Sequence, residues 1–389
     1  MAETIRVLHV LGGVGLGGAE SRIMDLYRQM DRSEIQFDFL VHSSAMNRMH
    51  SDRKGNDKSR KPEFYDEEII KSGGRIYVLP KFKVYNYLSY RKAAKKFFRE
   101  HHEFRVVQGH MTSTAGIYLP IARKCGVPVT VAHSRNAGVE KGAKGLATKF
   151  FRRNLVKKAD CCFACSYLAG EDVFGRKAME QGMVKIIHNA IDAGKFTYDA
   201  AKRSQMRERL GLTDNLVIGH VGRFNYQKNH PYLIEIFAQL CKIRQDAVLI
   251  LLGEGPDQSA VQEKCHVLGI EDKVRFLGNQ RQPEKFYQAM DLFVLPSFFE
   301  GLPGVLVEAQ AAGLKCLVSD TVTREADITD LVTYLSIEQP AKVWADEIQR
   351  QARYDRTDTC QIIKNAGFDV KAQAAGYRDF YQKGDSSGL

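Results

Sequence analysis

The sequence alternates short β-branched segments with amphipathic segments of helical length, and this alternation constrains the fold more than any other feature. Helical patterns cover residues 19–30, 86–102, 113–125 and 145–158. Strands separated by helices of this length form βαβ units, so the pattern predicts a parallel sheet. The candidate strands of this first series lie at residues 5–13, 37–43, 75–80, 105–110, 127–134, 161–166 and 184–189.

A second series of strands and helices follows after a break in the pattern. Its candidate strands lie at residues 216–223, 247–253, 274–278, 292–297 and 315–320. Residues 190–214 separate the two series and are interpreted as an exposed linker followed by a basic helix. Residues 370–384 carry one more amphipathic helical pattern. We therefore predict an α/β fold with two doubly wound domains, at 1–195 and 196–370, and a C-terminal helix and tail at 371–389.

Charge is distributed unequally between the two predicted domains. The 389 residues include 57 Lys and Arg and 46 Asp and Glu, which gives a net charge of +11. Residues 1–195 hold 34 basic and 20 acidic side chains, a net of +14, whereas residues 196–389 hold 23 and 26, a net of −3. Halves of opposite sign indicate different partners, and a basic half suits phosphate, nucleic acid or an anionic membrane.

The sequence gives no pattern of membrane insertion or export. It contains no run of eighteen apolar residues, and its first residues lack the pattern of a signal peptide. The eight cysteines show no framework spacing, and we interpret Cys161, Cys162 and Cys165 as small buried residues rather than a metal or redox site. These features favour a reducing, cytoplasmic setting. The polar and charged residues 44–65 are interpreted as a mobile surface loop.

The first candidate binding motif is LGGVGLGGAES at residues 11–21, directly after a predicted strand and at the start of a predicted helix. Its glycines let the backbone approach a bulky anionic ligand, and the helix N-terminus offers N–H groups. The spacing is partly that of a dinucleotide-binding turn, but no acidic residue follows at the right distance after a second strand. A tight turn without a ligand is the alternative.

The second motif is GRFNYQKNH at residues 222–230, at the end of the first strand of the second series. Arg223 and Lys228 follow the carboxyl end of a parallel strand, which is where such sheets bind ligands. A guanidinium and an ammonium together can hold a diphosphate and neutralise its charge as it leaves. A solvated basic pair is the alternative interpretation.

The third motif, PSFFEGLPGVLVEAQAAG at residues 296–313, is the most specific. Glu300 and Glu308 lie eight positions apart, and a helix is expected to begin near Pro303. The backbone N–H groups of residues 301–305 can hold phosphates, and ionised carboxylates suit sugar hydroxyls as acceptors. Paired carboxylates also occur in glycosidases, but a hydrolase would not need the surrounding phosphate-binding groups.

These motifs resemble the signature blocks of the retaining glycosyltransferase family 4. The blocks are GGAE (17–20), GRF…QKN (222–229), LLGEGP (251–256) and EGLPGVLVEA (300–309), in the same order and the same strand-to-loop settings. LVSDTVTREADITDLVTYL (317–335) is similar to the branch that builds bacterial capsular and exopolysaccharides. The resemblance covers nearly the whole chain and implies the GT-B fold, two Rossmann-like domains facing a cleft, with a C-terminal helix that returns to the N-terminal domain. It also implies that the N-terminal domain mostly binds the acceptor and that the C-terminal domain binds the nucleotide-sugar.

The resemblance also implies roles for individual residues. Arg223 and Lys228 would hold the donor diphosphate, Glu300 would contact the hydroxyls of the donor sugar, and Glu308 would contact the ribose. His133 matches a position near the donor sugar where the family often has a histidine; a core histidine is the alternative, and His110 is a weaker candidate. This chain has SDTVTREAD where many relatives carry a glycine-rich turn, so no role is assigned to Glu325. The implied donor-binding residues are completed by Gly17, Gly18, Gly222, Gly301, Leu302, Pro303 and Gly304.

Glycosyl transfer requires an oxocarbenium-like centre that is stabilised while a diphosphate departs. The resemblance implies front-face transfer with retention, in which the leaving phosphate takes the proton of the acceptor. Arg223 and Lys228 would replace a metal ion, and we expect neither a metal nor a cofactor. The expected partners are a nucleotide-sugar donor, with UDP as the commonest nucleotide in the family, and a saccharide acceptor that is lipid-linked.

Two basic segments suggest attachment to the inner face of the cell membrane. Residues 140–160 hold seven basic and two acidic side chains, with Leu146, Phe150, Phe151 and Leu155 at helical spacing. Residues 91–105 combine six basic and two acidic side chains with Phe97 and Phe98. Basic amphipathic helices bind anionic membranes, although the same apolar residues could pack on the sheet.

Two other classes of function are considered. The first is a GT-B enzyme of another type, a nucleotide-sugar epimerase or a phosphorylase, and the latter would need a pyridoxal-phosphate lysine in a longer chain. The second is a basic nucleic-acid-binding protein. That class lacks aromatic readout motifs here and leaves Glu300 and Glu308 unexplained, so we expect no nucleic acid partner.

Overall fold

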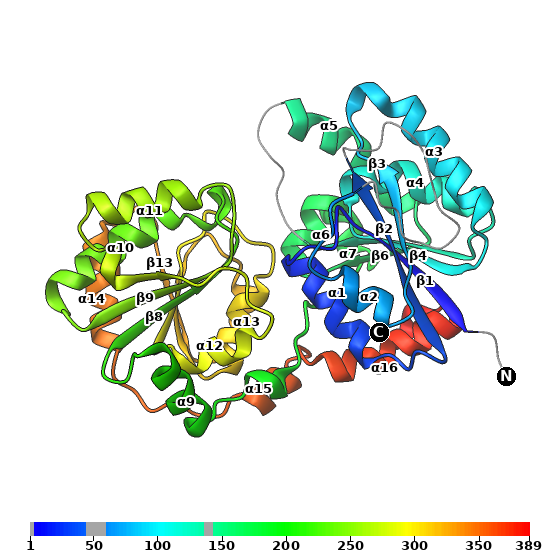
Figure 1. The fold of residues 1–389 in the computed structure, drawn as a ribbon. Helices are drawn as coiled ribbons and strands as arrows, with labels where there is room; N and C mark the ends of the chain where they lie inside the picture. The colour runs from blue at the N-terminus through cyan, green and yellow to red at the C-terminus, as the bar shows by residue number, and fades with distance from the viewer. Residues whose placement is uncertain (1–3, 44–59, 136–142) are drawn as a thin grey trace. The chain divides into compact units, whose positions relative to one another are not determined.

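The computed structural model describes residues 4–43, 60–135 and 143–389 (Figure 1). The chain divides into two compact units: unit 1 comprises Met1–Asn189 with Val370–Leu389, and unit 2 comprises Ala190–Asp369. Each unit is built around one parallel sheet covered by helices. The predicted α/β class with two doubly wound sheets is therefore confirmed.

Unit 1 contains a seven-stranded sheet in the order β3-β2-β1-β4-β5-β6-β7. Its strands are β1 (Ile5–Val10), β2 (Ile35–Ser43), β3 (Ile76–Pro80), β4 (Phe104–Gly109), β5 (Val129–Ser134), β6 (Cys161–Ala164) and β7 (Lys185–Ile186). Its helices are α1 (Gly18–Gln29), α2 (Asp66–Lys71), α3 (Tyr87–Glu100), α4 (Thr112–Lys124), α5 (Ala143–Arg152), α6 (Tyr167–Phe174), α7 (Arg176–Glu180) and α16 (Val370–Lys383). Three short 3-10 turns are η1 (Val84–Asn86), η2 (Leu155–Lys157) and η6 (Ser386–Gly388).

The core of unit 1 lies between its sheet and the apolar faces of the helices. The C-terminal helix α16 packs against α1, as Figure 1 shows in red and blue, and the Tyr381 hydroxyl donates a hydrogen bond to Gln108 Oε1 at 2.9 Å. The end of the chain thus completes the first unit, as predicted. Phe97 and Phe98 of α3 and Leu155 are buried in this core, which corrects their assignment to a membrane-facing surface.

Unit 2 contains a six-stranded sheet in the order β10-β9-β8-β11-β12-β13. Its strands are β8 (Leu216–Val221), β9 (Ala247–Leu252), β10 (Val274–Phe276), β11 (Leu292–Leu295), β12 (Lys315–Ser319) and β13 (Val332–Leu335). Its helices are α8 (Ala193–Phe196), α9 (Ala200–Leu210), α10 (His230–Ile243), α11 (Gln258–Val267), α12 (Pro283–Ala289), α13 (Gly304–Ala311), α14 (Ala341–Gln351) and α15 (Cys360–Asn365). Three short 3-10 turns are η3 (Tyr226–Lys228), η4 (Glu271–Lys273) and η5 (Arg324–Ala326).

Both sheets reverse their strand order beside their first strand. In unit 1, β1 lies between β2 and β4, and in unit 2, β8 lies between β9 and β11. Sheets of this topology bind ligands outside the carboxyl ends of the strands at the reversal, because the loops diverge there and leave a crevice. In unit 2, the ends of β8 and β11 are the points where the second and third sequence motifs begin.

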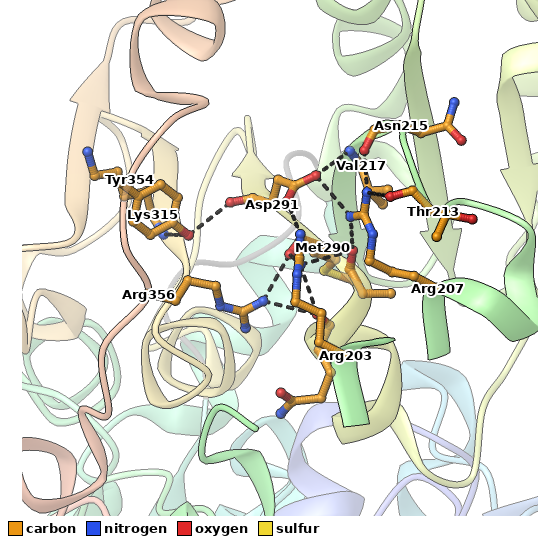
Figure 2. Close-up of polar contacts among 12 residues, drawn as sticks. Arg203, Arg207, Thr213, Asn215, Val217, Met290, Asp291, Lys315, Tyr354 and Arg356 are labelled. Atoms are coloured by element: carbon orange, nitrogen blue, oxygen red, sulfur yellow. Dashed lines mark hydrogen bonds and ion pairs between the residues drawn. The ribbon is translucent and has the colours of Figure 1, made fainter. Parts of the chain in front are cut away.

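An arginine cluster secures the opposite, amino end of β11 (Figure 2). Arg207 donates to the carbonyl of Ala289 at 3.0 Å and to Asp291 Oδ2 at 3.1 Å, and Arg356 donates to the carbonyl of Met290 at 3.0 Å. Arg203 donates to the same Met290 carbonyl at 2.7 Å. These carbonyls lie at the C-terminus of α12, where positive charge is favoured, and Arg203 and Arg207 hold α9 against the sheet.

The structure differs from the sequence prediction in two strands, and it adds the helices α2, α6 and α7 to unit 1. It adds the strand β13, and it reduces the strand predicted at 184–189 to the two residues of β7. Residues 190–214 are not an exposed linker throughout, because Ile191 is fully buried and its N–H donates to the carbonyl of Phe368 at 2.9 Å.

The loop predicted at residues 44–65 lies partly outside the described residues. Of the described part, Tyr65 is buried and its N–H donates to the carbonyl of Val14 at 3.1 Å, so this end of the segment is packed. Within the described ranges, no helix has the length and apolarity needed to cross a membrane.

Candidate functional site

The loop after β8 is shaped by glycines of the neighbouring strand end. It runs from Gly222 through η3 to Asn229, whose φ of 53° is left-handed. Gly253, at the end of β9, has a φ of +127°, and a Cβ there would lie 2.2 Å from the carbonyl oxygen of Gly222. Only glycine fits this position, so the LLGEGP block serves to let two loops pack closely.

Lys228 and Glu300 form an ion pair beneath the loops. Lys228 Nζ lies 2.7 Å from Glu300 Oε1, and the two side chains are 13% and 8% exposed. The carboxylate also accepts hydrogen bonds from Ser297 Oγ at 2.9 Å and from Gln227 Nε2 at 3.0 Å. The sequence predicted separate ligand contacts for these two residues, and the structure brings them together as an ion pair whose carboxylate has two further hydrogen bonds.

Gln227 joins the loop after β8 to the loop after β11. Its side chain donates to the carbonyl of Phe299 as well as to Glu300, and its own carbonyl accepts from the N–H of Phe298 at 2.9 Å. The Tyr226 ring stacks on the Phe298 ring with centroids 4.6 Å apart. The two motif loops therefore form one rigid surface around the Lys228–Glu300 pair.

Glu308 lies in the second turn of α13 and is buried. The Tyr287 hydroxyl donates to Glu308 Oε2 at 2.8 Å and thereby fixes the carboxylate. The helix begins at Gly304 with Pro303 as its N-cap residue, as predicted. The N–H groups of the first turn of a helix have no partner within the helix, so this end of α13 can donate to an anion.

Arg223 differs from Lys228 in being exposed. Among the residues that the structure describes, it takes part in no hydrogen bond or ion pair. An exposed guanidinium on the loop that carries Lys228 can donate two parallel hydrogen bonds to a phosphate. Glu325 lies in η5, where Thr323 Oγ1 accepts from its N–H at 3.3 Å.

Two buried histidines, His220 and His230, pack beside the loop after β8. Burial lowers the pKa of His220 to about 3 and the pKa of His230 to about 2, so both imidazoles are neutral. His220 Nδ1 lies 2.8 Å from the carbonyl oxygen of Val294, and the His230 ring stacks on Phe224 with centroids 4.1 Å apart. A Cβ at Gly222 would lie 3.1 Å from His220 Nε2 and 2.9 Å from Lys228 Cε, which explains the glycine there.

In unit 1, the glycine loop after β1 is covered by an acidic side chain. Gly17 is the N-cap residue of α1 and Gly18 is its first residue. The Val14 N–H donates a hydrogen bond to Glu63 Oε2, and a Cβ at Gly13 would lie 2.6 Å from Glu63 Oε1. The loop therefore presents N–H groups to a carboxylate, which is consistent with an affinity for anions.

His133 belongs to a cluster of three buried histidines at the ends of β1, β4 and β5. Gln108 Nε2 lies 2.8 Å from His133 Nδ1, and His9 Nδ1 lies 3.0 Å from His110 Nε2. Burial, followed by the charge of Arg135, lowers the pKa of His110 and of His133 well below the ordinary value. The cluster is thus neutral, and Gln108 fixes the orientation of His133.

The residues that position the site are not among those predicted from the sequence. Gln227, Ser297 and Tyr287 each hold a motif carboxylate. Gln227 and Ser297 lie inside the second and third motifs. Their closeness to Lys228 and Glu300 in the sequence could have identified them as supporting residues. Tyr287 lies on α12, outside every motif, and nothing in the sequence connects it with Glu308.

Comparison with known proteins identifies the class of protein that carries this fold and site. Residues 202–367 match the family described as "Glycosyl transferases group 1", and residues 16–195 match "Glycosyltransferase Family 4". EpsF of Bacillus subtilis (strain 168), named as a glycosyltransferase, is 35% identical over 384 residues, which covers 97% of this chain and 96% of EpsF. The chain belongs to glycosyltransferase family 4.

More distant relatives carry more specific names. The capsular polysaccharide biosynthesis glycosyltransferase CapH of Staphylococcus aureus is 23% identical and covers 89% of this chain and 90% of CapH. An Escherichia coli UDP-Gal:alpha-D-GlcNAc-diphosphoundecaprenol alpha-1,3-galactosyltransferase is 27% identical over 56% of this chain and 58% of its own.

A solved structure shows the same fold. HepE of Anabaena, crystallised with UDP and glucose, superposes with a TM-score of 0.72 at 18% identity and covers 97% of this chain and 100% of that chain. The predicted GT-B class is confirmed by this likeness and by the two Rossmann-like sheets.

Proposed function

We propose that this glycosyltransferase moves a sugar from a UDP-sugar to a lipid-linked saccharide during synthesis of a cell-surface polysaccharide. The main support for a nucleotide-sugar donor is the Lys228–Glu300 pair. It lies at the strand-order reversal of unit 2, between the loops after β8 and β11. The names of CapH and of the undecaprenol-dependent relative support the acceptor class, and the UDP complex of HepE supports the nucleotide.

In this proposal, different groups of unit 2 bind different parts of the donor. Arg223 and Lys228 bind the diphosphate and neutralise its charge as it departs, with the N–H groups of residues 301–305 and Gly222 as further contacts. Glu300 accepts hydrogen bonds from the sugar hydroxyls, and Glu308, fixed by Tyr287, accepts them from the ribose. Lys228 can donate to the diphosphate while it keeps its bond to Glu300, because an ammonium group has three N–H donors, so no buried charge is left unpaired.

We propose that transfer proceeds with retention. The acceptor oxygen forms a bond to the anomeric carbon on the face from which the diphosphate leaves, the bond from that carbon to the phosphate oxygen breaks, and the departing oxygen takes the acceptor proton. The two cations take the part that a metal ion has in other transferases. We extend the proposal to Gly17, Gly18 and His133, which the family resemblance assigns to the donor.

We further propose that the enzyme works at the inner face of the cell membrane, bound through the basic segments at 91–105 and 140–160. The eight cysteines are all free thiols, which suits a reducing compartment. A lipid-linked acceptor would be presented at this surface.

A thermal-shift screen of nucleotides and nucleotide-sugars tests the donor class, because a ligand that binds only the native state raises the unfolding temperature. We expect UDP and a UDP-sugar to raise it, and Lys228→Met to abolish the rise. Lys342→Met, at an exposed lysine of α14, is the matched control and should keep it. A rise with a purine nucleotide and none with UDP would contradict the proposed donor. The anomeric configuration of the product, read by NMR, tests retention.

A further inference from the structure

Five exposed apolar side chains of unit 1 lie on elements that touch one another. They belong to η1, to the first turn of α3 and to α5, and together they are called the apolar tip. Their exposed fractions are 60% for Val84, 83% for Tyr85, 76% for Leu88, 71% for Leu146 and 68% for Phe150. Single exposed apolar residues are common, but a group on neighbouring elements indicates a docking surface.

Ring contacts hold the two elements of the apolar tip together. Phe151 of α5 packs edge-on against Phe82, with centroids 5.0 Å apart, and stacks on Tyr87 at 5.8 Å. Leu88 directly follows Tyr87, and Phe150 directly precedes Phe151 with its ring against it at 5.4 Å. The rings of Phe82, Tyr87 and Phe151 thus pack against one another. The neighbouring side chains of Leu88 and Phe150 remain exposed to solvent.

The surroundings of the apolar tip are basic without interruption. Residues 81–99 contain seven Lys and Arg and no Asp or Glu, and residues 143–159 contain six and none. Lys83, Lys92, Lys95 and Lys149 are exposed. Arg152 pairs with Asp172 at 3.0 Å, and Lys96 pairs with Glu100 at 3.8 Å. A second copy of this surface would be repelled by like charge, whereas an anionic lipid surface complements it.

We propose that the apolar tip inserts into the interfacial layer of an anionic bilayer, while the flanking lysines contact lipid headgroups. This inference rests on the proposed function for its purpose, since a lipid-linked acceptor lies in that layer, but its evidence is separate. The lipid contact would lie at residues 84–88 and at α5. It would not lie in the middle of the 91–105 segment, where Phe97 and Phe98 are buried.

Sedimentation with vesicles of phosphatidylcholine and phosphatidylglycerol in equal parts tests the assignment. The double variant Leu88→Ser/Phe150→Ser should lower the partition coefficient by about tenfold or more, because it removes the two apolar side chains that would be buried. The control Val267→Ser/Ile362→Ser removes exposed apolar side chains of unit 2 and should change nothing. Equal binding of the tip variant and the wild type would overturn the proposal.

A fluorescence measurement reports insertion itself. Tyr85→Trp places a tryptophan in the apolar tip, and the native Trp344 is fully buried in unit 2. We expect a blue shift of its emission on adding these vesicles, and quenching by brominated phosphatidylcholine. An unshifted, unquenched emission would overturn insertion. A wild-type dimer that the tip variant dissociates, without vesicle binding, would assign the surface to a second copy.

The two proposals can fail separately. The thermal shift caused by UDP is measured without lipid, and the tip variant should retain it, which also shows that the variant is folded. Loss of vesicle binding with a retained UDP shift supports the apolar tip. Vesicle binding through the apolar tip by a chain that responds to no nucleotide would reject the proposed donor and leave the membrane contact standing.

Discussion

Removing Lys228 tests whether the Lys228–Glu300 pair serves the stability of the fold, the transfer activity or both. The substitution Lys228→Met leaves a carboxylate that is 8% exposed with only the Ser297 and Gln227 hydrogen bonds. Breaking a buried pair from one side costs about 3–5 kcal/mol, and we expect the low end because these two neutral donors remain. Glu300→Gln should cost about 2 kcal/mol, since it removes a charged partner and keeps an amide.

The double variant Lys228→Met/Glu300→Gln should recover about half of the summed losses of the two single variants, because no uncompensated charge remains. The coupling free energy between the two substitutions should be about 2–3 kcal/mol. Urea unfolding followed by the fluorescence of Trp344 measures it, since this tryptophan is the only one in the chain, is buried in unit 2 and donates to the carbonyl of Ser336 at 3.0 Å.

Activity should follow a different pattern from stability. Transfer from the donor should fall by about 100- to 1,000-fold in Lys228→Met, and the double variant should stay equally inactive although about half of the summed loss of stability is regained. A double variant that regains transfer would show that Lys228 acts only by neutralising Glu300. Additive losses of stability would show that the two side chains do not pair in solution.

Other substitutions and conditions probe the supports of the site. Because the folded pKa of His220 and His230 is about 3 and about 2, stability is full above the unfolded pKa and falls as the pH drops. Between pH 7 and pH 5 unit 2 should lose about 2 kcal/mol per histidine, and His230→Phe should remove about half of that loss in urea unfolding. Tyr287→Phe should raise the KM for the donor about tenfold with an unchanged kcat, since only the orientation of Glu308 is lost; an unchanged KM would remove Glu308 from donor binding. Gly253→Ala should destabilise unit 2 by about 1–3 kcal/mol, because its φ and the Gly222 carbonyl exclude a Cβ, and an unchanged urea midpoint would contradict that geometry.

The sequence predicts the sheets well because their strands are buried on both faces and read as continuous apolar runs. The strand β13 was not predicted, because its four residues are only half-buried at the sheet edge and form no continuous apolar run. The apolar residues of α3 show the opposite difficulty. Helical spacing is the same for a face on a sheet and a face on a membrane, so the burial of Phe97 and Phe98 could not be predicted from their pattern.

The site could be predicted as far as topology carries it. Parallel strands bring Lys228 and Glu300 to one edge although they lie 72 positions apart in the chain. That they bond directly, with Gln227 and Ser297 completing the carboxylate, depends on side-chain geometry that spacing does not encode. The contact of Tyr287 with Glu308 joins two elements through space and has no counterpart in sequence order.

Hydrogen–deuterium exchange of the whole chain with and without saturating UDP tests the central claim most directly. The proposed site predicts slower exchange in residues 222–229 and 301–309 when UDP is bound, and no slowing in the Lys228→Met variant. Unchanged exchange in both segments, or protection confined to other parts of the chain, would contradict a nucleotide-diphosphate site at the ends of β8 and β11.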